Sequence, residues 1–139
     1  MSEKALGLLG LARRGSLLAI GEEPVGMACR GGKARLLLIA KDAGDHTFRR
    51  ARSFCRTGKP PYICAPYTKE ELGNALGCNA CALCAVLDAP MAKAVLEALN
   101  EPDKYREILE ILAVQCRRIE KRRQEQQAHQ KNVKFGKKK

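Results

Sequence analysis

Residues 21–35 combine a tight turn, a short helix and a glycine stop in a way that could bind an anion. Gly21 and Pro24 predict a turn that opens a helix, and Gly31-Gly32 predict where that helix ends. The first N–H groups of a helix have no intrahelical acceptor, and the helix dipole favours negative charge beside them. Because the chain carries a formal net charge of +11 at pH 7, the anion that we expect is a phosphate backbone.

Basic side chains surround this segment in the sequence. Arg13-Arg14 precede it, Lys33 and Arg35 follow its helix, and Lys41 comes directly after an apolar run. Each phosphate that such a residue neutralises releases counterions, so these residues predict a salt-dependent attraction to nucleic acid. Each feature also has a purely structural interpretation. Gly21 could form only a turn, Lys41 could only end a strand, and the arginines of residues 49–56 could form only a solvated helix face.

Three of the seven cysteines, Cys78, Cys81 and Cys84, stand at two-residue intervals. Such gaps let thiolates converge on a zinc ion or an iron–sulfur cluster. However, Cys84 falls within an expected strand and the run lacks a fourth ligand, whereas buried cysteine commonly acts as a small hydrophobic residue. We therefore expect no metal and no cofactor. The odd number of cysteines fits reduced thiols in the cytoplasm better than a disulfide framework.

Residues that could act in catalysis are scarce. The chain contains only two histidines, His46 and His129, and neither has an evident nucleophile or carboxylate partner in the sequence. The run Gly31-Gly32-Lys33 lacks the remainder of a phosphate-binding loop motif. We expect that the protein is not an enzyme.

Helices and short strands alternate from the N-terminus to residue 100. Apolar residues at helical spacing, glycine stops and a Thr68–Glu71 capping box predict helices, and continuous apolar runs predict strands. Asp45 is expected to be the N-cap of its helix. The alternation predicts an α/β fold, a three-layer α-β-α sandwich. The expected helices cover residues 5–14, 24–30, 46–55, 69–76 and 90–99, and the expected strands cover residues 17–20, 36–40, 62–65 and 82–87.

Beyond Asn100 the chain becomes a basic helical extension. Residues 101–103 predict a helix start, and from Arg117 onward 10 basic residues accompany 2 acidic ones. We expect a domain at residues 1–100, an amphipathic C-terminal helix at 101–128 and a basic, disordered tail at 129–139. An apolar stripe on the helix could dock on its own domain, pair with another protein, or lie on an RNA-bound protein. The stripe consists of Tyr105, Ile108, Leu109, Leu112, Cys116 and Ile119.

The order of elements and several motifs resemble one protein family. It is the family of ribosomal proteins of the large-subunit seven-Ae and thirty-e type, in particular its bacterial YlxQ-like branch. The motifs are residues 8–14 (LLGLARR), the Gly21 turn, residues 32–35 (GKAR), residues 40–43 (AKDA) and residues 71–77 (ELGNALG). The resemblance covers about residues 5–100. It implies a four-stranded mixed sheet and binding of structured RNA, typically the kink-turn, an internal loop with tandem G·A pairs.

The resemblance also implies which residues contact RNA. In this family the helix-opening turn reads Gly-Thr-Asn-Glu-x-x-Lys. This chain keeps the glycine at Gly21 but has Glu23, Pro24 and Met27 at the Asn, Glu and Lys positions. We therefore expect a different RNA loop, or recognition dominated by the basic residues. A second family contact, an apolar loop that packs on flipped bases, matches residues 78–82. The residues expected to contact RNA are Arg13, Arg14, Gly21, Glu22, Glu23, Lys33, Arg35, Lys41, Asn79, Ala80 and Cys81.

These features together predict a non-enzymatic RNA-binding protein of the ribosomal or ribosome-associated kind. Its expected partners are structured RNA, in particular ribosomal RNA, and the ribosome, in the cytoplasm. The sequence shows neither a signal-peptide pattern nor an apolar run of about 20 residues, so no membrane partner is expected. The alternative is a ribosome-associated adaptor that recruits a protein partner through its C-terminal helix, by Tyr105, Ile108, Leu109, Leu112 and Ile119.

Overall fold

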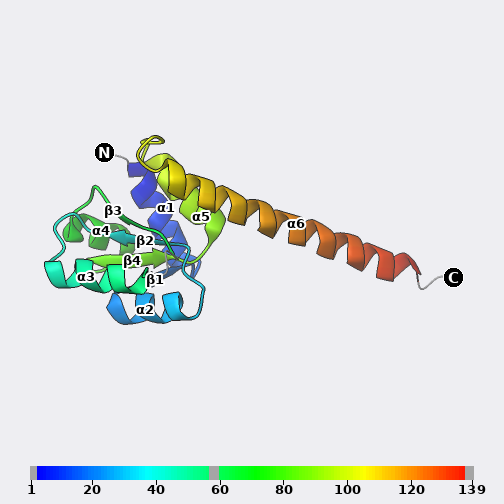
Figure 1. Cartoon of the computed structure of the whole chain (residues 1–139), viewed down its shortest axis with the longest axis horizontal. Coiled ribbons are helices and arrows are strands. Elements are labelled where there is room, and N and C mark those ends of the chain that lie inside the picture. Colours follow the sequence, from blue (N-terminus) through cyan, green and yellow to red (C-terminus); the bar gives the residue numbers. More distant parts are fainter. Residues whose placement is uncertain (1–2, 57–59, 137–139) are drawn as a thin grey trace.

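The computed structural model describes residues 3–56 and 60–136, with side-chain positions to residue 129. Helices and strands alternate as expected, and a long helix follows them (Figure 1). In chain order the elements are α1 (Glu3–Arg14), β1 (Leu18–Ile20), α2 (Glu22–Arg30), β2 (Leu36–Ile39), α3 (Asp45–Phe54), β3 (Tyr62–Cys64), α4 (Lys69–Leu76), β4 (Leu83–Val86), α5 (Ala89–Ala98) and α6 (Arg106–Gly136).

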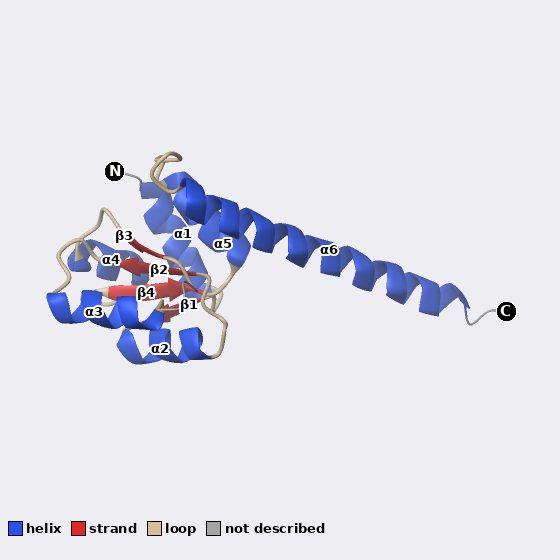
Figure 2. Ribbon diagram, viewed as in Figure 1, coloured by secondary structure: helices blue, strands red, loops and turns tan. Residues whose placement is uncertain are grey.

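Four strands form one mixed sheet in the order β1-β4-β2-β3 (Figure 2). β4 runs antiparallel to both β1 and β2, whereas β2 and β3 are parallel. In this register Leu38 of β2 pairs with Cys84 of β4 on one side and with Ile63 of β3 on the other. The carboxyl ends of β1, β2 and β3 therefore lie at the same end of the sheet as the amino end of β4.

Helices cover both faces of the sheet, which confirms the expected three-layer α-β-α sandwich. α2 and α3 pack on one face, and α1, α4 and α5 pack on the other (Figure 1 and Figure 2). The side chains of β2 divide between the two cores. Leu37 and Ile39 join the core under α2 and α3, whereas Leu36 and Leu38 join the opposite core. All four are fully buried, because a central strand is covered on both of its faces.

Local signals fix the ends of several helices. α4 begins with the complete capping box, in which Thr68 Oγ1 accepts from the Glu71 N–H at 3.1 Å and Glu71 Oε1 accepts from the Thr68 N–H at 2.9 Å. The bond from the Thr68 backbone also lowers the pKa of the Glu71 carboxyl. Gly77 ends α4 in the left-handed conformation, at φ 78°.

The expected N-cap of α3 is wrong by one residue. Gly44 is the N-cap, and Asp45 is the first helical residue. The extended backbone of Gly44, at φ −73° and ψ 163°, opens the helix without any side-chain cap. Asp45 instead places its charge in the first turn, where the helix dipole favours it.

The first four residues of the apolar stripe pack on the chain's own domain, whereas Cys116 and Ile119 lie beyond this contact and are partly exposed. α6 lies against α5, and Tyr105 and Leu112 are 4% and 0% exposed. Ile108 and Leu109 are partly buried against the same core. Of the interpretations that the sequence left open, the structure shows docking on the domain itself for the stripe as far as Leu112.

The expected helix start at residues 101–103 is wrong, because residues 102–105 form a turn and α6 begins at Arg106. The chain must reverse its direction between α5 and α6 for the two helices to pack together. Asn100 begins this reversal with a φ of 59°, a left-handed conformation that asparagine tolerates better than most residues.

α6 continues to Gly136 and extends well beyond the domain (Figure 1). We expected the helix to end at residue 128, but no glycine or proline interrupts residues 106–135, so nothing local stops it there. Of the expected tail, residues 137–139 lie outside the described residues. In the described parts of the chain, no helix is both long and apolar enough to cross a membrane.

Candidate nucleic-acid interface

Four connections meet where the carboxyl ends of β1, β2 and β3 adjoin the amino end of β4. We call this surface the loop end; it consists of Gly21 with the first turn of α2, residues 40–45, residues 65–71 and residues 77–82. Main-chain hydrogen bonds of 2.9 Å join these connections: Gly21 N–H to Leu83 C=O, Ala40 N–H to Ala82 C=O, and Cys81 N–H to Lys69 C=O. The loop end is therefore a surface whose segments are far apart in the sequence and are held together by main-chain hydrogen bonds.

A hydrogen bond to the Asp42 side chain joins the connection after β2 to the start of α4. Its Oδ1 accepts a hydrogen bond of 2.8 Å from the Lys69 N–H. The neighbouring Lys41 N–H donates to the Tyr67 carbonyl at 2.9 Å, while the Lys41 side chain stays exposed. This role of Asp42 could not be predicted from the sequence, because its partner lies 27 residues away and no local spacing indicates such a bond.

Gly21 sets the direction in which α2 leaves the sheet. Its φ of 94° and ψ of 164° place it in a region that residues with a side chain rarely occupy. The Val25 N–H donates to the Gly21 carbonyl at 3.1 Å, and Pro24 has no N–H. The open first turn of α2 therefore offers two amides to a ligand, those of Glu22 and Glu23, rather than the longer cluster expected from the sequence.

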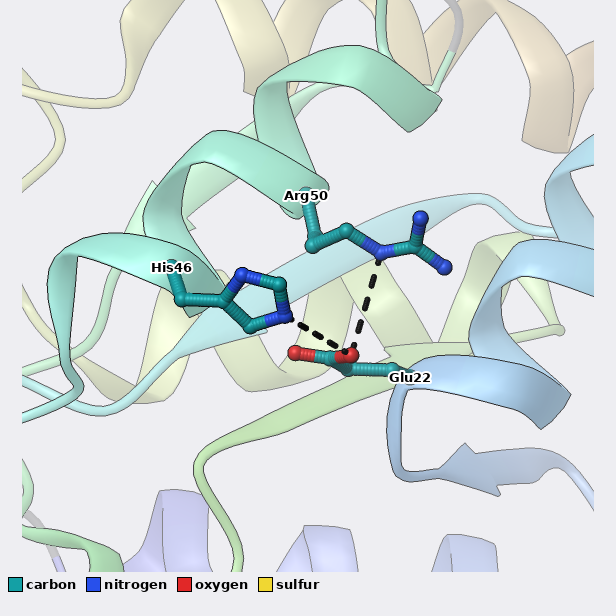
Figure 3. Close-up of polar contacts among 3 residues, drawn as sticks. All are labelled: Glu22, His46 and Arg50. Atoms are coloured by element: carbon teal, nitrogen blue, oxygen red, sulfur yellow. Dashed lines mark ion pairs between the residues drawn. The ribbon is translucent and has the colours of Figure 1, made fainter.

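The Glu22 carboxylate points toward α3 (Figure 3). Its Oε2 lies 3.6 Å from His46 Nε2 and 3.7 Å from Arg50 Nε. Arg50 also lies over the ring of Phe54, with 5.2 Å between its Cζ and the ring centroid. The same ring lies 3.0 Å from the position of a Cβ added to Gly26, so the two helices approach closely. The Glu22 side chain thus contributes to the contact between α2 and α3.

Replacing Gly21 with alanine is expected to lower the free energy of unfolding by about 1–3 kcal/mol, because the backbone conformation excludes a side chain. Crowding is not the cause, since the nearest atom to an added Cβ is Pro24 Cδ at 3.9 Å. Gly44→Ala is the matched control: Gly44 also precedes a helix, but its φ is −73° and nothing lies within 4 Å of an added Cβ. Urea denaturation measures the difference, and equal midpoints for the two variants would contradict the prediction.

Residues 77–82 fold back over α4. The Cys78 N–H donates to the Gly73 carbonyl at 2.8 Å, and the backbone of Ala80 lies directly over Gly73. Asn79 and Ala80 are exposed, whereas the Cys81 side chain is only 3% exposed. Of the three residues expected to contact RNA here, Asn79 and Ala80 present their side chains to solvent, whereas the Cys81 side chain is buried and packs beneath the loop.

The cysteines at positions 78, 81 and 84 belong to the packing of this loop and of β4. Cys81 Sγ donates to the Leu83 carbonyl at 3.5 Å. The pKa of the Cys84 thiol is raised well above the usual range, first by the hydrogen bond that Cys84 forms with Cys81 and then by its complete burial. A thiol that stays protonated is a poor metal ligand. Within the described residues, no three His, Cys, Asp or Glu side chains are grouped so that they could hold a metal ion.

Sequence comparison relates this chain to an RNA-binding protein. It is 32% identical over 97 residues to the RNA-binding protein YlxQ of Bacillus subtilis (strain 168), a match that covers 67% of this chain and 92% of YlxQ. The chain belongs to the YlxQ family. This membership confirms the YlxQ-like branch of the resemblance that the sequence motifs indicated. No family model matches the chain.

Two solved structures are similar to this chain. A protein with unknown function from Bacillus halodurans C has a TM-score of 0.65 and 32% sequence identity, covering 70% of this chain and 98% of that chain. The Giardia lamblia 15.5kD RNA binding protein has a TM-score of 0.58 at 20% identity, covering 74% of this chain and 85% of that one. The second similarity shows a shared fold.

Three of the expected basic residues of this YlxQ-family chain lie at or beside the loop end. Lys41 belongs to it directly. Arg13 and Arg14 end α1 and are exposed, and Arg14 lines a shallow surface hollow with Glu71, Asn74 and Ala75 of α4. Arg13 Nη1 lies 3.4 Å from a Cβ added to Gly77, the first residue of the loop that follows α4.

Lys33 and Arg35 lie at the opposite end of the sheet. The Arg35 N–H donates to the carbonyl of Val86, the last residue of β4, at 2.8 Å. Because β4 is antiparallel to its neighbours, its last residue lies far from the connections that form the loop end. The structure therefore divides the expected contact residues into two groups, one at each end of the sheet.

Proposed function

We propose that this protein binds structured RNA at the loop end, without catalysing a reaction, as a ribosomal or ribosome-associated protein of the cytoplasm. One observation carries the proposal: the Gly21 turn, Lys41 and residues 78–82, each singled out separately in the sequence, converge on one surface. The relative from Bacillus subtilis, itself named as an RNA-binding protein, supports the choice of ligand.

The loop end suits recognition of RNA by shape. Sequence-specific RNA recognition mostly targets loops and bulges, whose unstacked bases can be contacted individually. Ala80 and the half-buried Cys78 offer a small apolar surface to a base, and the Glu22 and Glu23 amides offer donors to a phosphate or base oxygen. Lys41, with Arg13 beside Gly77, supplies local positive charge.

We propose a kink-turn-like bend or internal loop as the target, rather than a standard kink-turn. Pro24 stands where the resembling family has a glutamate that accepts from guanine edges, and its side chain can accept nothing. Met27 replaces a lysine and is 66% exposed, so it offers an apolar contact in place of a charge. A target with an unstacked base at this position fits these residues better than one with a phosphate there.

Binding assays with defined RNAs test the proposal. We expect micromolar or tighter binding to large-subunit ribosomal RNA fragments that contain internal loops, weaker binding to plain duplexes, and a steep loss of affinity with salt. On titration, the amide resonances of Glu22, Glu23, Val25 and residues 79–82 should shift. Affinity no better than for poly-glutamate, or unmoved resonances at these positions, would refute the assignment of the site.

The alternative function, an adaptor that recruits a protein through the C-terminal stripe, is not favoured by any contact. Tyr105, Ile108, Leu109 and Leu112 already pack against the domain's own core. A partner that used this stripe would first have to displace α6 from α5.

A further inference from the structure

One side of α3 carries three arginines that the loop end does not use. Arg49 and Arg52 lie on α3, Arg56 follows its last turn, and all three are exposed. With Ser53 they line a shallow surface hollow of about 300 Å³. We call these four residues the arginine stripe.

The charges of the arginine stripe have no counterpart in the described part of the chain. Arg50, on the neighbouring side of the helix, pairs with Glu22. Arg49, Arg52 and Arg56 form no ion pair with any described residue. Because like charges three or four residues apart destabilise a helix, packing gives no reason for this arrangement. Guanidinium groups bind phosphate bidentately, so such a row is suited to a polyanion.

The side chains of the loop end by themselves carry more negative than positive charge. Its two lysines stand among six carboxylates: the lysines are Lys41 and Lys69, and the acidic residues are Glu22, Glu23, Asp42, Asp45, Glu70 and Glu71. Phosphate contacts nevertheless supply much of the affinity of RNA-binding proteins. The phosphates of an RNA bound at the loop end must therefore contact basic side chains elsewhere on the protein.

The position of α3 connects the two surfaces. α2 and α3 both begin at the loop end and cover the same face of the sheet (Figure 1 and Figure 2). α3 has 10 residues, so the stripe descends about 15 Å along the domain from the bound loop. We infer that the arginine stripe is a second RNA contact, which binds the phosphate backbone of the duplex that flanks the recognised loop. This inference rests on the proposed function.

The triple variant Arg49→Gln, Arg52→Gln, Arg56→Gln tests the inference by fluorescence anisotropy with a looped RNA hairpin. We expect about tenfold or weaker affinity at 0.1 M salt and a salt slope smaller by about 2 to 3, as for the loss of three phosphate contacts. A hairpin whose flanking duplex is shortened to a few base pairs should bind the wild type and the triple variant equally, because it cannot reach the stripe.

A matched control removes the same net charge elsewhere. Lys4→Gln, Lys104→Gln and Arg106→Gln lie at the start of α1 and around the α5–α6 turn. This control should keep wild-type affinity and at most a slightly reduced salt slope. If it loses as much affinity as the stripe variant, only net charge matters and the inference is overturned.

Ser53→Glu separates a binding role from a folding role. A carboxylate among the three arginines should leave the melting temperature unchanged or raise it, while it weakens binding of the long hairpin severalfold. Failure of the wild type to bind any looped RNA would refute the proposed function itself. Two outcomes would refute only the inference. In one, the wild type binds looped RNA and both stripe variants bind it with the same affinity. In the other, poly-glutamate binds the stripe as tightly as the RNA does.

Discussion

Gly73→Ala is expected to lower the free energy of unfolding by about 2–3 kcal/mol and to abolish the preference for looped RNA. A Cβ added to Gly73 would stand 2.7 Å from Ala80 Cα and 2.8 Å from both Ala80 N and the Cys78 carbonyl oxygen. All three atoms belong to the backbone, so no side-chain rotation relieves the clash. Residues 78–80 must move, and with them the exposed Asn79 and Ala80 that we assign to RNA contact.

Gly7→Ala is the control for this prediction. Gly7 also lies within a helix, but nothing is found within 4 Å of a Cβ added there, and alanine favours the helix by about 0.5–1 kcal/mol. Urea denaturation followed by circular dichroism should therefore show opposite shifts for the two variants. A Gly73→Ala protein that kept both stability and loop preference would show that residues 78–80 do not need their present position.

Leu112→Ala is expected to cost about 3 kcal/mol of unfolding free energy, because it leaves a cavity where α6 meets the domain. Leu112 is 0% exposed and belongs to the same core cluster as Tyr105 and Leu96. The neighbouring Ile111→Ala is the control: Ile111 is 43% exposed, so its truncation should cost well under 1 kcal/mol. Chemical denaturation of the two variants gives the comparison directly.

The same pair of variants distinguishes the two functions that the sequence allowed. If α6 is docked as the structure shows, amide hydrogen exchange in the first turns of α6 should accelerate in Leu112→Ala and not in Ile111→Ala. Equal and small effects of both substitutions would mean that the stripe is not packed on the domain. The adaptor function would then regain its binding surface.

The different roles that we propose for the loop end and the arginine stripe follow from the kinds of side chains that each surface carries. The loop end contains backbone turns, small side chains and carboxylates, which suit recognition of an unusual RNA shape. The stripe and the exposed basic residues of α6, among them Arg117, Arg118 and Lys121, suit contact with any phosphate backbone. Variants at the loop end should therefore change which RNA is preferred, whereas stripe variants should change how strongly affinity depends on salt.

The sequence by itself determined the elements, because their signals act over a few residues. The capping box of Thr68 and Glu71, the stop at Gly77 and the buried run of β2 each depend on neighbours within four positions. The alternation of helices and strands then led to the layered architecture, since covered strands need helices on both faces. The motifs that indicated the YlxQ family are likewise short stretches of sequence, which can be identified without knowledge of the tertiary structure. For the elements themselves, the expectations were wrong only at their ends, such as the N-cap of α3 and the start and end of α6.

Only the tertiary structure decided which of the chosen residues share a surface. The strand order β1-β4-β2-β3 places Gly21, Lys41 and Asn79 together and puts Lys33 and Arg35 at the other end of the sheet. The apolar stripe of α6 could equally have faced a partner until its packing on α5 was seen. The physical reason is that strand pairing and helix docking depend on contacts between residues tens of positions apart. Local spacing and charge do not encode which of the compatible partners each segment meets.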